Sequence, residues 1–510
     1  MESGAEAYTP PDSSRPFDMA SRPLGAHERE GRGPPTPLIL VILVMLAIRL
    51  IAANQIHLTE DEAYYRLWSM APAFGYFDHP PMIAWWIWLG RRLGGDDALG
   101  VRLLPILASA ATSLLVFDMA RLAGASRRIA GRAGIWFNAM WLVAAGGFLA
   151  VPDAPNSFFW ALALWASLRA MRAGAIGWWM AAGAAAGLAA LSKYSALFLA
   201  PGMVIWLAWT PKGRAALRTP GPWIAALIAV ALFGINIGWN ADHRWLTFHK
   251  QFGRVAGARF APRYLAEFIG GQFLLLNPLI ALFIGAAAAV RAKAGTRAID
   301  LAPFLATCAP LVAYLVVHSL HDRVEAHWPA PIYPALAIVA AAGAEHLKGW
   351  KGWRRAAAAV PILGAAIIVA ALAWLAVPGA ANVRADPATP VRGWPAFAGR
   401  LEGLRTDNGA AWVGTTSYGL DAELSTEPAL AAPIFQITER DRWRDLAQPP
   451  PDLSRPGLVI DLTRRLNPAA LDRCFEQVRP LGVITRDAGA VAYAVYLVSG
   501  PRRAVLAEGC

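Results

Sequence analysis

The chain has 510 residues, of which 56% are hydrophobic and only 16% are charged, and its mean hydropathy is +0.39. A soluble domain carries about 25% charged residues, so this composition excludes a wholly soluble protein and predicts an integral membrane protein with one soluble part. The net charge of +12 would suit nucleic acid. However, Lys and Arg cluster in short loops between apolar spans, where they set topology and contact anionic membrane lipids. We therefore expect membrane lipids and no nucleic acid as partners.

Residues 1–37 are rich in Pro, Gly, Ser and charge, and predict a disordered cytoplasmic tail. A membrane domain is expected over 38–377. Some of its spans are shorter than the ~20 residues of an upright helix. We expect eleven of them, near 38–54, 98–120, 133–151, 155–170, 177–192, 195–210, 221–239, 264–290, 301–318, 328–345 and 356–377.

The connectors between these spans alternate in charge. One set is basic and is therefore expected in the cytoplasm. The other set, with the segment 378–510, is then expected on the outer face. Within the first outer loop, 55–97, the stretches 63–70 and 80–92 predict interfacial helices, the second of them rich in tryptophan.

The composition changes past Pro378. Apolar runs alternate there with polar stretches of helical character, which predicts a small α/β or α+β domain over 378–510. The strand-like runs read AAWVGT, GLVIDL and VAYAVYLV. Cys474 and Cys510 lie in this segment and are able to form one disulfide in an oxidising compartment.

The first outer loop offers two groups of candidate site residues. Thr59 and Glu62 fit a helix capping box, but that interpretation leaves Asp61 without a role, and a carboxylate beside a partly dry cleft suits a general base. Asp78 and His79 belong either to a plain turn between two interfacial helices or to a substrate site.

Three later outer connectors each contribute candidates. Asp153 follows Pro152 in a tight turn, where it either caps a helix or binds a sugar hydroxyl, an amine or a cation. Lys193 interrupts about thirty apolar residues on the side where lysine is disfavoured, so an ammonium that meets a phosphate is favoured over a snorkelling side chain. The segment 318–328 (HSLHDRVEAHW) holds Arg323, whose guanidinium suits phosphate, and His327.

Zinc is weakly supported, because the His-rich segment lacks HExxH or HxH spacing. We predict no dedicated metal site. A divalent cation held by Asp61, Glu62 and Asp153 stays open as an alternative.

Five motifs, in this order and spacing, carry a resemblance to a known family: DEAYYRLWS at 61–69, GYFDHPPMIAW at 75–85, PDAP at 152–155, LSKYSALFLAPG at 191–202 and VEAHWPAPIYPALA at 324–337. Together they resemble bacterial GT-C glycosyltransferases of the dolichyl-phosphate-mannose–protein mannosyltransferase type, a superfamily that includes the aminoarabinose transferases of lipid A. The resemblance covers roughly residues 38–345.

The resemblance implies transfer of a sugar, with inversion, from a polyprenyl-phosphate donor to a hydroxyl or phosphate of an acceptor at the periplasmic face of the bacterial inner membrane. It implies Asp61 as the catalytic base with Glu62 beside it, and Asp153 in the sugar or acceptor site. Lys193, Arg323 and His327 are implied to face the donor phosphate.

Tyr194, which we expect to bind substrate together with Lys193, stands where members acting on lipid A often have the glycine of a Lys-Gly pair. The acceptor therefore stays open between lipid A or lipopolysaccharide, another glycan of the cell envelope, and a protein. The alternatives to an enzyme are a flippase or transporter of lipid-linked sugars and a non-catalytic membrane scaffold with a periplasmic binding domain. A scaffold predicts that Asp61, Asp153 and Lys193 lie far apart.

Overall fold

We analysed a computed structural model of the chain. It describes residues 33–252, 260–291, 299–347, 349–376, 386, 388–446, 448, 451–502, 505 and 509–510. The disordered tail expected over 1–37 therefore falls almost entirely outside the described residues.

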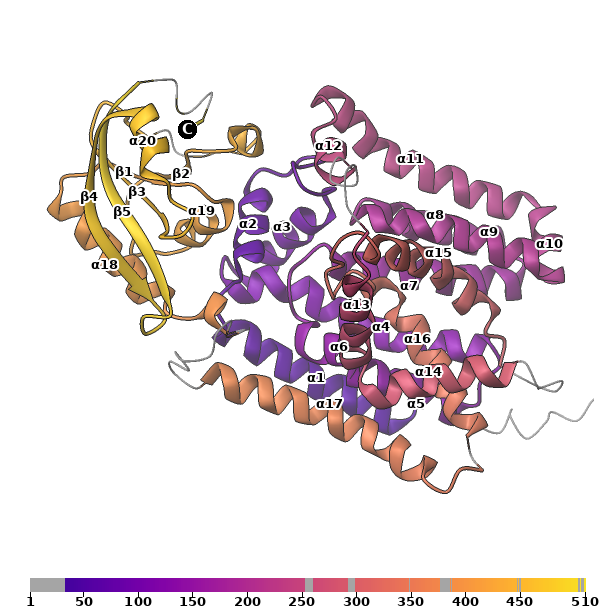
Figure 1. The fold of residues 1–510 in the computed structure, drawn as a ribbon. Helices are drawn as coiled ribbons and strands as arrows, with labels where there is room; N and C mark the ends of the chain where they lie inside the picture. The colour runs from indigo at the N-terminus through magenta and orange to yellow at the C-terminus, as the bar shows by residue number, and fades with distance from the viewer. Residues whose placement is uncertain are drawn as a thin grey trace, which may run out of the picture. The chain divides into compact units, whose positions relative to one another are not determined.

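The membrane part is built from helices (Figure 1). Within the described residues, five helices are long and apolar enough to cross a membrane, namely α1, α4, α11, α15 and α17, and two bent pairs raise this to seven. The number of eleven spans stays a prediction. The helices and 3₁₀ turns of this part are α1 Thr36–Gln55, α2 Glu60–Met70, α3 Met82–Gly94, α4 Ala98–Leu122, α5 Arg127–Ala139, α6 Trp141–Gly146, α7 Asp153–Ala173, α8 Ile176–Ala190, η2 Tyr194–Phe198, α9 Leu199–Trp209, α10 Pro211–Leu217, α11 Pro220–Asp242, α12 Leu246–Phe252, α13 Arg263–Leu275, α14 Pro278–Arg291, α15 Ala302–Ser319, η4 Ala330–Ile332, α16 Tyr333–His346 and α17 Trp353–Ala376.

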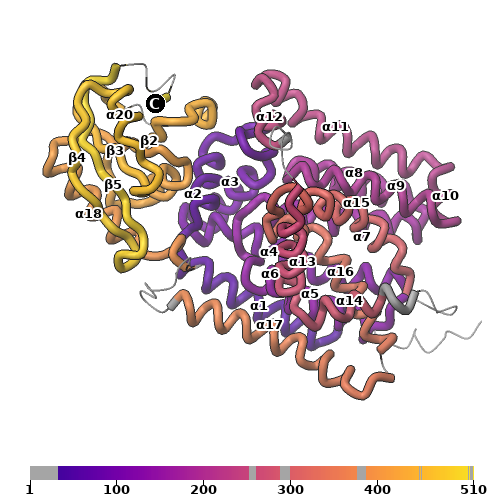
Figure 2. The backbone as a smooth tube through the Cα atoms, viewed as in Figure 1, coloured from indigo at the N-terminus to yellow at the C-terminus, as the bar shows by residue number. Residues whose placement is uncertain are grey.

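Helix α4 organises the packing of this part, because it contacts α1, α3, α5, α7 and α16. The main buried cluster joins α4, α5, α7 and α16 with α14 and α15. In Figure 2, α8 and α11 run beside each other, and the two helices are in contact. On another side, Met45 of α1, Ala144 of α6 and Ile368 of α17 form a small cluster of their own.

Two expected spans are broken rather than straight. The stretch 264–290 forms α13 and α14, which meet at an angle of 104°. Asn277 lies at the bend with a φ of 70°, Pro278 follows it, and the Asn277 amide donates to the carbonyls of Ala139 and Val360. The stretch 133–151 likewise divides into α5 and α6 at Met140. Hydropathy does not reveal these breaks, because both halves of each stretch are apolar.

The C-terminal segment folds around a five-stranded sheet with the order β2-β1-β3-β5-β4. Strands β1, β2 and β3 are parallel, whereas β5 is antiparallel to both β3 and β4. The three strand-like runs seen in the sequence form β1, β3 and β5. The elements are η5 Thr389–Val391, α18 Trp394–Asp407, β1 Trp412–Thr415, α19 Tyr418–Ser425, β2 Ile434–Gln436, η6 Arg440–Trp443, β3 Gly457–Leu462, α20 Pro468–Cys474, β4 Phe475–Arg486 and β5 Val491–Pro501.

Both faces of this sheet are covered. Phe397 of α18 and Leu420 of α19 pack on one face, and Leu471 of α20 packs on the other. Cys474 and Cys510 form a disulfide, as the sequence allows.

Candidate active site

Helix α2 begins with a complete capping box. The Thr59 hydroxyl accepts from the Glu62 backbone N–H, and the Glu62 carboxylate accepts from the Thr59 N–H at 3.1 Å. The same carboxylate is fully buried and forms a two-pronged ion pair with Arg102 of α4, at 2.8 and 2.6 Å. It also accepts from the Ala150 N–H at 2.9 Å.

Through these bonds, Glu62 connects α2 to α4 and to the segment before α7. Burial acts to raise the pKa of Glu62, but the charge of Arg102 and the hydrogen bonds outweigh it, so this pKa is held below its usual range. Arg102 satisfies its remaining donors with the carbonyls of Ala53, Ile56 and His57. A carboxylate so engaged stays ionised and positions its neighbours.

Asp61, one residue earlier, has a different environment. It is half-buried, and its Oδ1 accepts a hydrogen bond of 3.1 Å from the Tyr418 hydroxyl. The pKa of Asp61 is raised to about 6, chiefly by burial and then by the charge of the neighbouring Glu60, while the Tyr418 hydrogen bond acts in the opposite direction. A carboxylate whose pKa lies just below neutrality is suited to accept a proton during a reaction.

A second group of charged residues gathers at the start of α7. Both oxygens of Asp153 accept from the Lys193 ammonium at 2.8 Å, and His327 Nε2 lies 3.7 Å from Asp153 Oδ2. Asp153 is the first residue of α7, and its side chain does not cap the helix. Its carboxylate is buried, whereas 48% of the His327 side chain is exposed.

The two groups belong to one constellation. The His327 ring lies near enough to Asp61 to favour its ionised form, in addition to its contact with Asp153. Three connectors that we expect on the outer face thus meet beside α2. A non-catalytic membrane scaffold predicts that Asp61, Asp153 and Lys193 lie far apart. Their proximity therefore disfavours the scaffold alternative.

Asp78 lies next to this constellation. Burial raises the pKa of Asp78, against the charge of Arg442. Its carboxylate binds the buried Arg442 guanidinium and accepts from the Tyr64 hydroxyl at 3.2 Å. The His79 ring packs edge-on against Tyr65, with 6.2 Å between ring centroids.

Tyr194 and Arg323 make their contacts elsewhere. The Tyr194 hydroxyl donates to Asn236 Oδ1 at 2.9 Å, so it binds α11. The Arg323 side chain is 70% exposed, and its Nε lies 3.6 Å from Glu267. For Arg323, no interaction with Asp61, Asp153 or Lys193 is found in the described part of the chain.

The described residues contain no group of three or more His, Cys, Asp or Glu placed to hold a metal ion. Both oxygens of Glu62 bind Arg102, and both of Asp153 bind Lys193. In this arrangement the acids Asp61, Glu62 and Asp153 do not share a set of free ligand oxygens.

Three residues of this region were not predicted from the sequence. Tyr418 and Arg442 come from the C-terminal segment, 357 and 364 positions from their partners in the first outer loop. Nothing local distinguishes either residue, and only a long-range contact reveals it. For Arg102 a signal exists, since an arginine four residues into an apolar span requires a buried acid.

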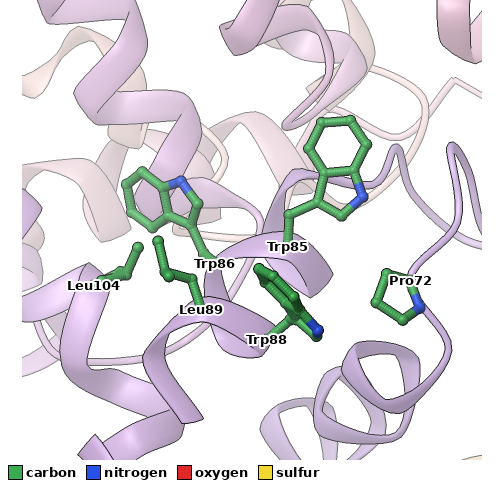
Figure 3. Close-up of a pocket in the computed structure, with 6 residues that line it drawn as sticks. All are labelled: Pro72, Trp85, Trp86, Trp88, Leu89 and Leu104. Atoms are coloured by element: carbon green, nitrogen blue, oxygen red, sulfur yellow. The ribbon is translucent and has the colours of Figure 1, made fainter. Parts of the chain in front are cut away.

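An apolar cavity of about 450 Å³ lies along α3 (Figure 3). Its wall consists of aromatic and aliphatic side chains, and it includes none of the acidic or basic residues above. It suits hydrocarbon rather than a sugar. The lining residues are Pro72, Trp85, Trp86, Trp88, Leu89 and Leu104.

Comparison with known proteins found one matching family model and several similar sequences. The family model of dolichyl-phosphate-mannose-protein mannosyltransferase matches residues 78–239. Lipid A galacturonosyltransferase RgtD of Rhizobium johnstonii is 31% identical over 289 residues, which cover 55% of this chain and 59% of that protein. Undecaprenyl phosphate-alpha-4-amino-4-deoxy-L-arabinose arabinosyl transferase of Pseudomonas aeruginosa is 28% identical over 198 residues, covering 36% and 35% respectively. The chain thus spans between one third and three fifths of the length of these relatives.

The fold has solved counterparts. The structure of ArnT from Cupriavidus metallidurans bound to undecaprenyl phosphate aligns with a TM-score of 0.62 and 14% identity, over 91% of this chain and 99% of that one. Its apo form aligns with a TM-score of 0.60 and 16% identity, over 90% and 97%. At these identities, the two likenesses show the fold alone.

Proposed function

We propose that the protein is an inverting glycosyltransferase that moves a sugar from a polyprenyl-phosphate donor to an acceptor at the periplasmic face of the bacterial inner membrane. The observation that carries the proposal is the meeting of Asp61 with Asp153, Lys193 and His327 from separate connectors. The constellation combines one acid of raised pKa with a paired cation, the two groups that such a transfer requires.

In the proposed step, Asp61 accepts the proton of the acceptor hydroxyl. The acceptor oxygen forms a bond to the anomeric carbon, the bond from that carbon to the phosphate oxygen breaks, and polyprenyl phosphate leaves with the bonding electrons. The raised pKa of Asp61, about 6, leaves it ionised at neutral pH yet basic enough to take the proton, which typically contributes about 10²–10⁴-fold.

Lys193 and His327 are proposed to face the phosphate of the donor. A phosphate is a good leaving group once its charge is balanced, so a fixed ammonium replaces acid catalysis. Asp153 would hold the ammonium in place through its two hydrogen bonds. We propose a positioning role for Glu62, whose oxygens are fully engaged, and assign Asp78 and His79 to the wall of the site.

The relatives support the donor and acceptor classes that we propose. One relative is named for undecaprenyl phosphate and another for lipid A, which supports a polyprenyl-phosphate sugar as donor. A lipid A acceptor is the first to test, before other glycans and proteins. The apolar cavity along α3 supports a lipid-borne substrate. Few charges lie along the long apolar helices, so the flippase alternative is not favoured.

The proposal is tested by transfer of labelled sugar from a polyprenyl-phosphate pool in membranes that contain the protein. Asp61→Asn should lower transfer by about 10²–10⁴-fold because it removes the base. Lys193→Ala should lower it by about 10²-fold or more, since it removes the charge that balances the leaving phosphate.

A matched control is Asp118→Asn. Asp118 also binds a cation, Arg169, at 2.5 Å, but it lies sixteen residues beyond Arg102 on α4, roughly 24 Å along the helix. This variant should transfer sugar like the wild type. Unchanged transfer in Asp61→Asn, with the acceptor dependence intact, would overturn the assignment.

A further inference from the structure

The hydroxyl that binds Asp61 comes from the C-terminal segment. Tyr418 is the first residue of α19, and it donates to Asp61 Oδ1 at 3.1 Å. We find no hydrogen bond to the other oxygen, Oδ2, from any described residue. A proton that arrives from a substrate can therefore bind Oδ2, because the Tyr418 hydroxyl occupies Oδ1.

Helix α19 is fastened against α2 and the segment before it. His57 lies between two acids of this helix region, with its Nε2 2.7 Å from Glu427 and its Nδ1 3.3 Å from Glu423. Gly419 faces the first turn of α2 so closely that a Cβ there would lie 2.5 Å from Glu60 Oε2. A residue with a side chain at position 419 would therefore require Glu60, the neighbour of Asp61, to move.

Arg442 makes a third contact between the C-terminal domain and the first outer loop, after those of His57 and Gly419. Arg442 of η6 binds Asp78, and its guanidinium lies 4.4 Å from the centre of the Tyr418 ring and 5.4 Å from that of Tyr64. Tyr64 and Tyr418 are themselves in contact, at 4.9 Å between centroids. Ring stacking and charge together hold Tyr418 in one orientation.

We infer that Tyr418 is a positioning residue for the proposed base Asp61, and that the C-terminal domain thereby completes the catalytic site rather than only covering it. The inference rests on the proposed function, since it assigns the role of base to Asp61. The hydroxyl fixes the rotamer of the carboxylate, and its hydrogen bond favours the ionised form that accepts the proton.

Several titratable groups face Asp61 and share in setting its behaviour. Glu60 and Tyr65 belong to α2 itself, Asp78 comes from the turn before α3, and His327 comes from the late outer loop. Loss of the Tyr418 hydroxyl leaves these four unchanged. The change expected in Tyr418→Phe is therefore assigned to one hydrogen bond, because phenylalanine keeps the ring contacts.

The test compares wild type with Tyr418→Phe in the full-length protein. The pH dependence of kcat/KM for sugar transfer should show an acid limb that lies about one pH unit higher in the variant. Above pH 8 the two proteins should differ by less than about threefold, since Asp61 is then ionised in both. Tyr496→Phe, a change on β5 away from α2, should leave the profile of the wild type unchanged.

A second readout does not depend on transfer. A carbodiimide modifies protonated carboxyl groups, so the pH midpoint of Asp61 labelling, followed by mass spectrometry, should rise by about one unit in Tyr418→Phe. A raised midpoint without any transfer in the wild type would overturn the proposed function and leave the Tyr418–Asp61 interaction standing. Transfer with an unchanged acid limb and an unchanged midpoint would overturn the inference on Tyr418.

Discussion

Acidic residues on the two sides of the contact between α2 and α19 are buried in different ways. On the membrane part, Glu62 and Asp153 each bind a cation through both oxygens. On the C-terminal domain, Asp421 and Glu423 are equally buried, yet Asp421 Oδ2 and both oxygens of Glu423 have no hydrogen-bond partner among the described residues.

This difference in hydrogen-bond partners determines the protonation state: the acids that bind a cation stay ionised, whereas the others favour the protonated form. The Arg102 guanidinium offsets the cost of burying Glu62, whereas for Asp421 and Glu423 the effect of burial exceeds that of the Arg440 and Arg486 charges and favours the neutral form. Accordingly the pKa of Glu62 is lowered, while burial raises the pKa of Asp421 to about 8 and that of Glu423 well above its usual range. The pKa of Asp61, about 6, lies between the lowered pKa of Glu62 and the raised pKa of Asp421.

The largest effect is expected where a buried pair is broken. Glu62→Gln should lower the free energy of unfolding by about 3–5 kcal/mol, because it leaves the Arg102 charge buried without a counter-charge. Thermal unfolding of the purified protein in detergent measures this loss. Asp96→Asn is the control, since Asp96 pairs with Arg66 and Arg91 but is half exposed, and such pairs contribute about 0–1 kcal/mol. Equal losses in both variants would show that burial does not distinguish the pairs.

The opposite sign is expected for Asp421, whose Oδ2 has no hydrogen-bond partner among the described residues. Asp421→Asn should raise the free energy of unfolding by about 1–3 kcal/mol at pH 8, because the amide has no charge to desolvate. The folded-state pKa of Asp421, about 8, lies above its unfolded value. The unfolded chain therefore releases this proton first, and the stability of the wild type falls as the pH rises between about 4 and 8.

Thermal unfolding across this pH range checks the sign. The advantage of Asp421→Asn should shrink as the pH falls toward 4, where both states of the wild type keep the proton. Asp472→Asn, an exposed position on α20, should give no such pH dependence. An Asp421→Asn variant that is less stable than the wild type at pH 8 would mean that the ionised carboxylate is stabilised there.

Hydropathy and the family motifs anticipated much of this architecture. The ends of α1, α4, α11 and α15 lie within three residues of the expected spans, because long apolar runs have few alternative structures. The bend at Asn277 escaped prediction, since it depends on the carbonyls of Ala139 and Val360, which are distant in sequence.

The candidate site divides in the same way. The motifs pointed to Asp61, Asp153, Lys193 and His327, and the structure brings these four together. Tyr418 had no local signal, because its significance comes from a partner 357 positions away. Glu62 and Asp61 are adjacent in the sequence, so only the packing of Arg102 distinguishes the structural acid from the proposed base.

The smallest effect is expected for Arg323, which the family resemblance places at the donor phosphate. Its side chain is 70% exposed and pairs with Glu267, which is itself half exposed. Arg323→Ala should change sugar transfer by no more than about threefold, since surface pairs contribute about 0–1 kcal/mol, whereas Lys193→Ala should abolish most of it. Glu267→Gln serves as the matched control and should behave like Arg323→Ala. If Arg323→Ala alone loses transfer to the extent of Lys193→Ala, then the guanidinium must leave Glu267 and bind the phosphate when the donor is present. In that case Arg323 would belong to the reactive site, although its guanidinium would reach the phosphate only in the complex with the donor.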